Sequence, residues 1–136
     1  MGLVYADITI SNLIDVGLER RGFLKKPEIR QTTVTAMVDT GAATIIIDED
    51  TRQKLGLEIV GDKGAELADG TKHRYAITEP VEIQWKDRTA VCYAMVVPGS
   101  NDVLLGAIPL EIMDLIIHPS KQELTGAHGD EIVYRV

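Results

Sequence analysis

Apolar residues recur at every second position in several short stretches of the chain, a spacing typical of half-buried β-strands. The clearest example is VYADITI at 4–10, whose even-numbered residues are all apolar. The stretch QTTVTAMV at 31–38 alternates in the same way and runs directly into a polar Asp-Thr-Gly at 39–41. Valine, isoleucine and threonine, which favour strands, dominate these stretches. The pattern predicts an all-β protein.

Turn residues between these stretches predict three β-hairpins. Asp69-Gly70, within ELADGTKHRYAI, is the favoured pair for a two-residue turn, in which both central residues take positive φ. Lys86-Asp87-Arg88 and Pro119-Ser120 mark the second and third hairpins. The last six residues, EIVYRV at 131–136, fit a terminal strand.

Only two segments have the features of helices, and both are short. DEDTRQKLG at 48–56 begins with acidic residues and ends at a glycine, and AIPLEIMD at 107–114 follows Gly106. The polar segment 15–30 is predicted as a connection or a hairpin. One or two short helices are therefore expected beside the strands.

Length, composition and charge narrow the class of protein. The 136 residues, 45% of them hydrophobic and 26% charged, predict one domain spanning 1–136. No apolar run approaches the roughly 18 residues that a membrane-spanning helix needs, so no membrane association is expected. The formal net charge of −7 disfavours a nucleic-acid binder. The basic stretch RRGFLKK at 20–26 is either a solvated loop or a partner contact.

The first residues show neither a secretory signal nor a myristoylation motif, which predicts a cytoplasmic protein. The single cysteine, Cys92, fits a reducing compartment and is interpreted as an inert core thiol, with a nucleophile or an intermolecular disulfide as alternatives. Trp85 alternates with other apolar residues and is interpreted as core rather than as a ligand platform. The three histidines are scattered without metal-ligand spacing, so no metal is expected, and no motif in the chain predicts a cofactor.

The triplet Asp39-Thr40-Gly41 is the strongest candidate for chemistry. Alone it could be an ordinary turn. Here it follows an apolar strand, precedes three isoleucines at 45–47 and an Asp-Gly hairpin about 30 residues on, and is followed by VLLGAIPLEI at 103–112. In combination, over roughly residues 31–124, this order resembles the retropepsin-like aspartic proteases, the single-domain family that includes retroviral proteases.

The resemblance implies a closed, single-domain acid-protease barrel and a role for each matching residue. Asp39 would be the catalytic carboxylate, with Thr40 and Gly41 completing the active-site loop and the Thr40 hydroxyl bracing a partner loop. Leu104-Leu105-Gly106 would pack behind that loop. Substrate would contact the loop and the tip of a closing flap, through Ala42, Ala43, Leu67, Ala68, Asp69, Gly70 and Thr71.

Two positions depart from the family pattern. Retroviral members usually carry an acidic residue where this chain has Ala43, so a contact to the substrate backbone is absent or supplied by another group. The flap carries one glycine, Gly70, rather than a glycine-rich tip. The first departure weakens the analogy for peptide specificity, and the second weakens it for flap mobility.

Aspartic-protease chemistry needs two carboxylates, one ionised and one protonated. The chain holds no second Asp-Thr/Ser-Gly, so the resemblance implies a homodimer that pairs two copies of Asp39 and gives a bell-shaped activity profile against pH. The expected function is that of an aspartic endopeptidase acting on a peptide or protein. A non-proteolytic peptide-binding or assembly module and a different hydrolytic activity stay open as alternatives.

Overall fold

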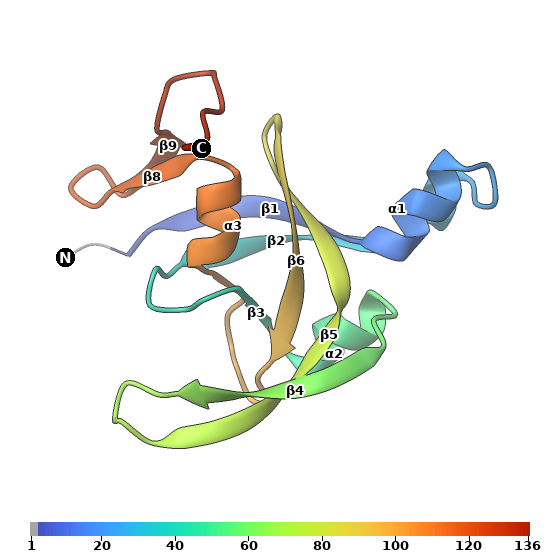
Figure 1. The fold of residues 1–136 in the computed structure, drawn as a ribbon, viewed down its shortest axis with the longest axis horizontal. Helices are drawn as coiled ribbons and strands as arrows, with labels where there is room; N and C mark the ends of the chain where they lie inside the picture. The colour runs from blue at the N-terminus through green and yellow to red at the C-terminus, as the bar shows by residue number, and fades with distance from the viewer. Residues whose placement is uncertain (1–2) are drawn as a thin grey trace.

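The computed structural model describes residues 3–136 and consists mainly of β-strands (Figure 1). The strands are β1 (Tyr5–Asn12), β2 (Gln31–Val38), β3 (Ile45–Ile47), β4 (Ile59–Glu66), β5 (Lys72–Trp85), β6 (Arg88–Val96), β7 (Leu104–Leu105), β8 (Leu115–His118) and β9 (Glu123–Gly126). The helices are α1 (Leu13–Arg20), α2 (Glu49–Lys54) and α3 (Ala107–Ile112), with a 3-10 turn at Lys26–Glu28. None of the described helices is long and apolar enough to cross a membrane.

The strand pairings form a ring. Seven strands follow the order β1-β2-β7-β3-β6-β5-β4, and β1 also pairs with β5, which leaves β4 at an edge. The β2–β7 and β3–β6 pairs are parallel, and the other pairs are antiparallel. A separate two-stranded sheet joins β8 to β9. The predicted all-β class with few helices is confirmed at this level.

Period-two alternation correctly predicts which strand faces are buried. The even-numbered residues of β1 and the segment before it, Val4, Ala6, Ile8 and Ile10, are all buried. Trp85 is buried with Val81 and Ile83 on β5, which confirms its interpretation as core. Cys92 is half-buried on β6, and burial raises the pKa of its thiol, as expected for an unreactive cysteine.

The segment 15–30 is a helix and a 3-10 turn, so the prediction of a polar connection or hairpin is wrong. The Asn12 side chain caps α1 by accepting a hydrogen bond from the Asp15 N–H at 3.1 Å. Asp15 in turn accepts two hydrogen bonds from the Arg30 guanidinium, at 2.8 and 2.9 Å. Gly17 in the middle of α1 disfavours a helix, and the buried residue of α1 is the polar Asp15, so the sequence shows no buried apolar face that would indicate a helix. The expected one or two short helices become three.

All three predicted hairpins form. The β4–β5 turn differs from the predicted two-residue turn, because five residues, 67–71, separate the last paired residues of β4 and β5. Only Gly70 in this turn has positive φ, +84°, and the Leu67 N–H donates to the Thr71 carbonyl at 2.8 Å. The other two hairpins connect β5 to β6 and β8 to β9.

The predicted terminal strand at 131–136 is absent, and this prediction is wrong. Glu131 makes only an isolated bridge to His128. The segment is instead attached to the end of α3: the Val133 N–H donates to Asp114 Oδ2 at 2.9 Å, and the Tyr134 hydroxyl donates to the Ile112 carbonyl at 2.6 Å. Two hydrogen bonds that involve side chains, one to the Asp114 carboxylate and one from the Tyr134 hydroxyl, thus replace the strand pairing that the alternation suggested.

Candidate active site

Asp39 lies at the first position after β2, and its backbone is fixed by the neighbouring strand. β2 lies between β1 and β7 in the sheet. The Asp39 N–H donates to the Leu105 carbonyl at 3.0 Å, and the Ala42 N–H donates back to the Asp39 carbonyl at 3.1 Å. Pairing on both sides fixes the register of β2, and this in turn fixes the position of Asp39 at the start of a tight turn.

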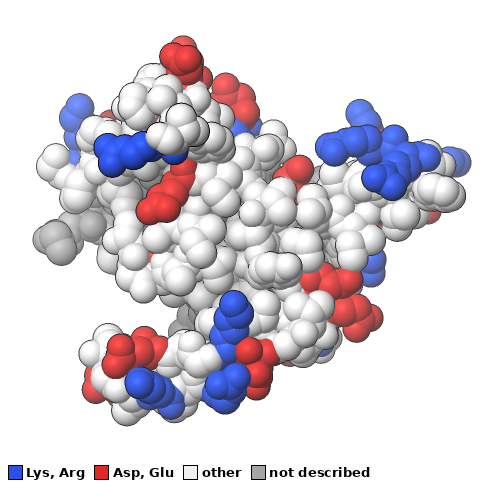
Figure 2. Space-filling view, in the orientation of Figure 1, with Lys and Arg blue, Asp and Glu red and all other residues white. Residues whose placement is uncertain are grey.

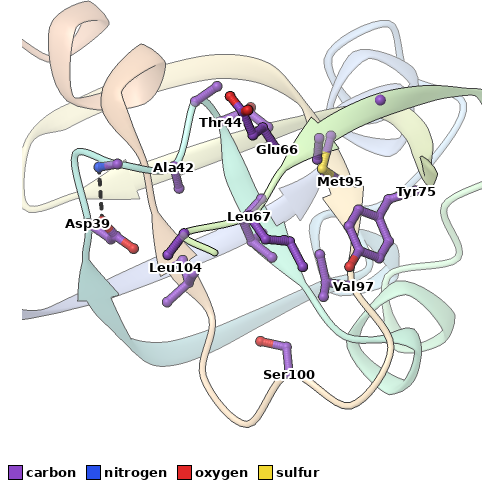
Figure 3. A pocket seen from close by; sticks show the side chains of 16 residues that line it. Asp39, Ala42, Thr44, Glu66, Leu67, Tyr75, Met95, Val97, Ser100 and Leu104 are labelled. Atoms are coloured by element: carbon purple, nitrogen blue, oxygen red, sulfur yellow. Dashed lines mark hydrogen bonds between the residues drawn. The ribbon is translucent and has the colours of Figure 1, made fainter. Parts of the chain in front are cut away.

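The Asp39 carboxylate is half-buried and has one occupied and one open oxygen. Oδ1 accepts a hydrogen bond from the Gly41 N–H at 2.9 Å (Figure 3). Oδ2 accepts none from residues 3–136. The turn thus provides a hydrogen bond to Oδ1 of the carboxylate that interrupts the apolar stretch. It leaves Oδ2 available to a ligand, water or a second chain.

β7 and α3 support the loop from behind. The first N–H groups of α3, from Ala107 and Ile108, donate to the carbonyls of Ala42 and Ala43, both at 2.8 Å. Gly106 permits this approach, since a Cβ there would lie 2.2 Å from the Thr44 carbonyl oxygen and 2.5 Å from that of Ala42. The predicted packing of 104–106 behind the loop is confirmed.

A cleft of about 740 Å³ opens beside Asp39. Figure 3 shows Asp39 on one side of the cleft and Tyr75 and Val97 on the other, with Leu67 between them. The lining residues come from the Asp39 loop, the β4–β5 hairpin and the strands beneath: Asp39, Gly41, Ala42, Ala43, Thr44, Ile46, Gly64, Ala65, Glu66, Leu67, Ala68, Tyr75, Met95, Val97, Ser100 and Leu104.

The sequence model of a protein family described as "gag-polyprotein putative aspartyl protease" matches residues 26–111. This span is more than half of the chain. The chain belongs to this family. The match contains the Asp39 loop, the β4–β5 hairpin and the Leu104–Gly106 segment, and it leaves out β1, most of the residues before β2, and the β8–β9 sheet. No curated protein matches the chain.

The residues predicted from the aspartyl protease resemblance divide into two groups. Six of the ten line the cleft: Asp39, Gly41, Ala42, Ala43, Leu67 and Ala68. The other four, Thr40, Asp69, Gly70 and Thr71, are exposed and lie outside the lining. Asp69 closes the hairpin turn by accepting hydrogen bonds from the Thr71 N–H and hydroxyl, at 2.9 and 2.6 Å, and the Thr71 hydroxyl bond lowers the pKa of the Asp69 carboxyl. Contact of these four residues with a peptide stays a prediction.

Several cleft residues were missed from sequence. Tyr75, Met95 and Val97 reach the cleft from β5, β6 and the residue after β6. Thr44, just after the loop, donates its hydroxyl to the Tyr93 carbonyl at 2.6 Å and so ties the loop to β6. The one available signal was alternation, which places Tyr75 on the same face as Ile77 and Val81 but cannot distinguish core from cleft.

The cleft of this family member is mostly apolar and carries negative charge. Among the described residues that line it, Asp39 and Glu66 are the only carboxylic acids, and none is Lys, Arg or His. Among residues 3–136 no group of three or more His, Cys, Asp or Glu side chains is placed to hold a metal ion. The chemistry available from these residues is therefore carboxylate acid–base chemistry beside an apolar surface.

Proposed function

We propose that this protein is an aspartic endopeptidase whose active form is a homodimer with one Asp39 from each copy in a shared site. The observation that carries the proposal is the half-buried Asp39 carboxylate, oriented by the Gly41 N–H and facing a peptide-sized cleft. Membership of the aspartyl protease family supports it.

A second carboxylate is required, and this chain alone offers a poor one. The other acid of the cleft, Glu66, is on β4, and Figure 3 shows it away from Asp39. It makes no hydrogen bond to Asp39 in the structure. Asp39 Oδ2 is open, so a second copy related by a two-fold axis can bring its own Asp39 to the same place.

The proposed reaction is a water-mediated hydrolysis. A water between the two carboxylates gives a proton to the ionised one as its oxygen attacks the scissile carbonyl carbon. The protonated carboxyl donates its proton to the carbonyl oxygen, which forms a neutral diol intermediate. Proton transfer to the amide nitrogen then breaks the C–N bond and releases an acid and an amine.

Each remaining part of the site has a role in this proposal. The Gly41 N–H holds Oδ1 so that the carboxylate keeps one orientation. Thr40 is exposed beside Asp39, where its hydroxyl can brace the loop of the second copy. The β4–β5 hairpin carries Leu67 and Ala68 over the cleft, where they can cover a bound peptide and exclude water.

The test is cleavage of a diverse peptide library at about pH 4 to 7 by the wild-type chain and three variants. Asp39→Asn should lower kcat by about a thousandfold or more, because an amide cannot act as the base. Glu66→Gln should keep kcat and change at most KM, since Glu66 is not the second carboxylate. Asp130→Asn is the matched control, because Asp130 is exposed and outside the cleft.

Two outcomes would contradict the proposal. Loss of turnover in Glu66→Gln would mean that the dyad is formed within one copy. Absence of cleavage by wild type, with a peptide still retained equally by wild type and Asp39→Asn, would favour the binding-module alternative. Circular dichroism of each variant establishes that the fold is retained.

A further inference from the structure

A cluster of basic residues projects from one end of the molecule. Arg20 ends α1, and Arg21, Lys25 and Lys26 follow it. All four are exposed, and with Phe23 we call them the basic tip. Figure 2 shows blue side chains gathered at the end where Figure 1 places α1. Four cations within seven residues contrast with the formal net charge of −7 for the whole chain.

The backbone of the basic tip is held in a defined conformation. The Gly22 N–H donates to the Glu19 carbonyl at 3.0 Å, and the Phe23 N–H donates to the Leu18 carbonyl at 2.8 Å. With Gly22 at φ +85°, these two bonds form the Schellman motif that ends a helix. Binding by this loop would therefore cost little ordering entropy.

Apolar side chains are exposed along the same end of the molecule. A hydrophobic residue just after a Schellman glycine frequently packs onto the last turn of the helix. Phe23 occupies that position, yet 76% of it is exposed, and Leu18 is 37% exposed. Ile14, one turn before Leu18, is 45% exposed. One aromatic and two aliphatic side chains thus remain exposed to water on the same segment as the cations.

We propose that the basic tip is a peripheral docking site for an anionic lipid surface. Cationic side chains next to exposed aromatic and aliphatic ones are the composition that binds the headgroup region, where the cations meet lipid phosphates and the apolar groups enter the acyl boundary. Two acidic residues, Glu19 and Glu28, lie in the same segment, and Glu28 already accepts a hydrogen bond from the Lys25 N–H at 2.8 Å.

Shape and charge favour a lipid surface over a protein or nucleic acid. The basic tip projects from the molecule (Figure 1). Exposed apolar side chains on a projecting segment can enter a fluid lipid surface without a complementary pocket. The acidic remainder of the chain would be repelled by the same surface, which orients the tip toward it. The sequence-based expectation of no membrane association rested on the lack of a long apolar run, which a peripheral site does not need.

Such docking would leave the cleft open to substrate. The basic tip precedes β2 and Asp39 follows it, so the eight residues of this strand separate the two sites by roughly 25 Å. This inference does not depend on the proposed peptidase activity.

The experiment is co-sedimentation with vesicles of phosphatidylserine and phosphatidylcholine, compared with vesicles of phosphatidylcholine alone. Wild type should bind the anionic vesicles, and raising the NaCl concentration from about 0.1 to 0.5 M should weaken binding. Lys25→Gln should weaken binding about fivefold and Phe23→Ala about tenfold. The matched controls Lys121→Gln and Ile116→Ala, both at exposed positions on the β8–β9 hairpin, should bind as wild type does. Asp39→Asn should also bind normally, which separates this inference from the proposed activity.

Three results would overturn the inference: no binding to anionic vesicles, equal losses in the tip variants and their controls, or binding to heparin or RNA but not to vesicles. A change of oligomeric state in Phe23→Ala on analytical ultracentrifugation would assign the tip to contact between copies instead. Thermal unfolding of each variant separates loss of binding from loss of fold.

Discussion

Gly106 is the residue at which the support of the Asp39 loop can be tested directly. A Cβ at this position would meet two backbone carbonyl oxygens, those of Thr44 and Ala42, at 2.2 and 2.5 Å. Neither can move without disturbing the loop or α3. Gly106→Ala should therefore reduce the free energy of unfolding by about 2–3 kcal/mol, measured by urea denaturation.

Gly17 provides the matched control for that substitution. It lies in the middle of α1, and a Cβ there would have no atom within 4 Å. Gly17→Ala should raise the free energy of unfolding by about 0.5–1 kcal/mol, because alanine favours the helix. Equal destabilisation by the two substitutions would show that the close approach at Gly106 is not what the loop depends on.

The Asp15–Arg30 pair predicts a dependence of stability on pH. The Asp15 side chain is 4% exposed and Arg30 is 51% exposed. Hydrogen bonds from the Arg30 side chain, opposed by burial, lower the pKa of the Asp15 carboxyl. A carboxyl with a lowered folded pKa stabilises the fold above its unfolded pKa of about 3.9, and the contribution is lost as pH falls through the folded value.

Asp15→Asn should therefore destabilise the protein by about 1–3 kcal/mol at pH 7, through the weakened hydrogen bonds to Arg30. The difference from wild type should shrink below about pH 4, where wild type loses the same contribution. Chemical denaturation at several pH values measures it, with Asp130→Asn as the control. A difference that stays constant down to pH 2 would contradict this assignment.

The residues of the candidate site were partly predictable from sequence. Asp39 and its loop could be predicted as the candidate site because the proposed chemistry needs particular residue types in a fixed order. Tyr75 could not, since alternation on β5 gives it the same face as Val81, which is fully buried. It lines the cleft because the hairpin end of β5 extends beyond the core, and that extent depends on packing between distant segments.

At the scale of elements, the β4–β5 hairpin is the segment whose mobility matters most for the proposed function. Nearly all of β4 is exposed, and β4 pairs only with β5. Few contacts therefore attach the hairpin to the rest of the protein. Its turn requires Gly70 at φ +84°. Gly70→Val should lower peptide turnover by about tenfold while reducing the free energy of unfolding by only about 1–2 kcal/mol.

Gly61→Val is the control for the hairpin. Gly61 is on β4 without positive φ, and a Cβ there meets no atom within 4 Å. Valine at this position should leave turnover close to the wild-type value, in a steady-state assay with one identified peptide. If Gly70→Val cleaves as fast as Gly61→Val, the hairpin does not act as a flap.

Elements with regular alternation and clear turn residues could be predicted, whereas α1 and the C-terminal segment could not. Helix α1 depends on the Asn12 cap and on Asp15 reaching Arg30, which is distant in sequence. The apolar alternation in EIVYRV suggests a strand, but Asp114 and the Ile112 carbonyl supply partners that keep the segment irregular. In both α1 and the C-terminal segment, hydrogen bonds between residues distant in sequence determine a structure that the local sequence pattern does not predict.

At the scale of the whole molecule, the ring of pairings depends on one contact that sequence does not specify. β1 pairs with β2 on one side and with β5 on the other. The β1–β5 pairing joins residues that are about 70 positions apart in the sequence. This closure holds β2 in place and with it the start of the Asp39 loop. The sequence predicted strands and a family resemblance, but pairings of this separation follow from the fold as a whole.

The proposed dimer determines how activity should respond to mixing. If each active site needs Asp39 from two copies, a heterodimer of wild-type and Asp39→Asn chains has one carboxylate and cannot act. The fraction of wild-type homodimers then falls as the square of the wild-type fraction once subunits exchange. Co-purification of tagged and untagged chains establishes that exchange has occurred.

The most direct test of the central claim is the peptidase rate of a fixed amount of wild type mixed with about a ninefold excess of Asp39→Asn. After exchange, the rate should fall to about a tenth of that of wild type alone, because about one wild-type chain in ten finds a wild-type partner. Asp130→Asn added in the same excess should not lower the rate per active chain. An unchanged rate after mixing with Asp39→Asn, with exchange demonstrated, would show that one Asp39 is sufficient and that the shared site is wrong.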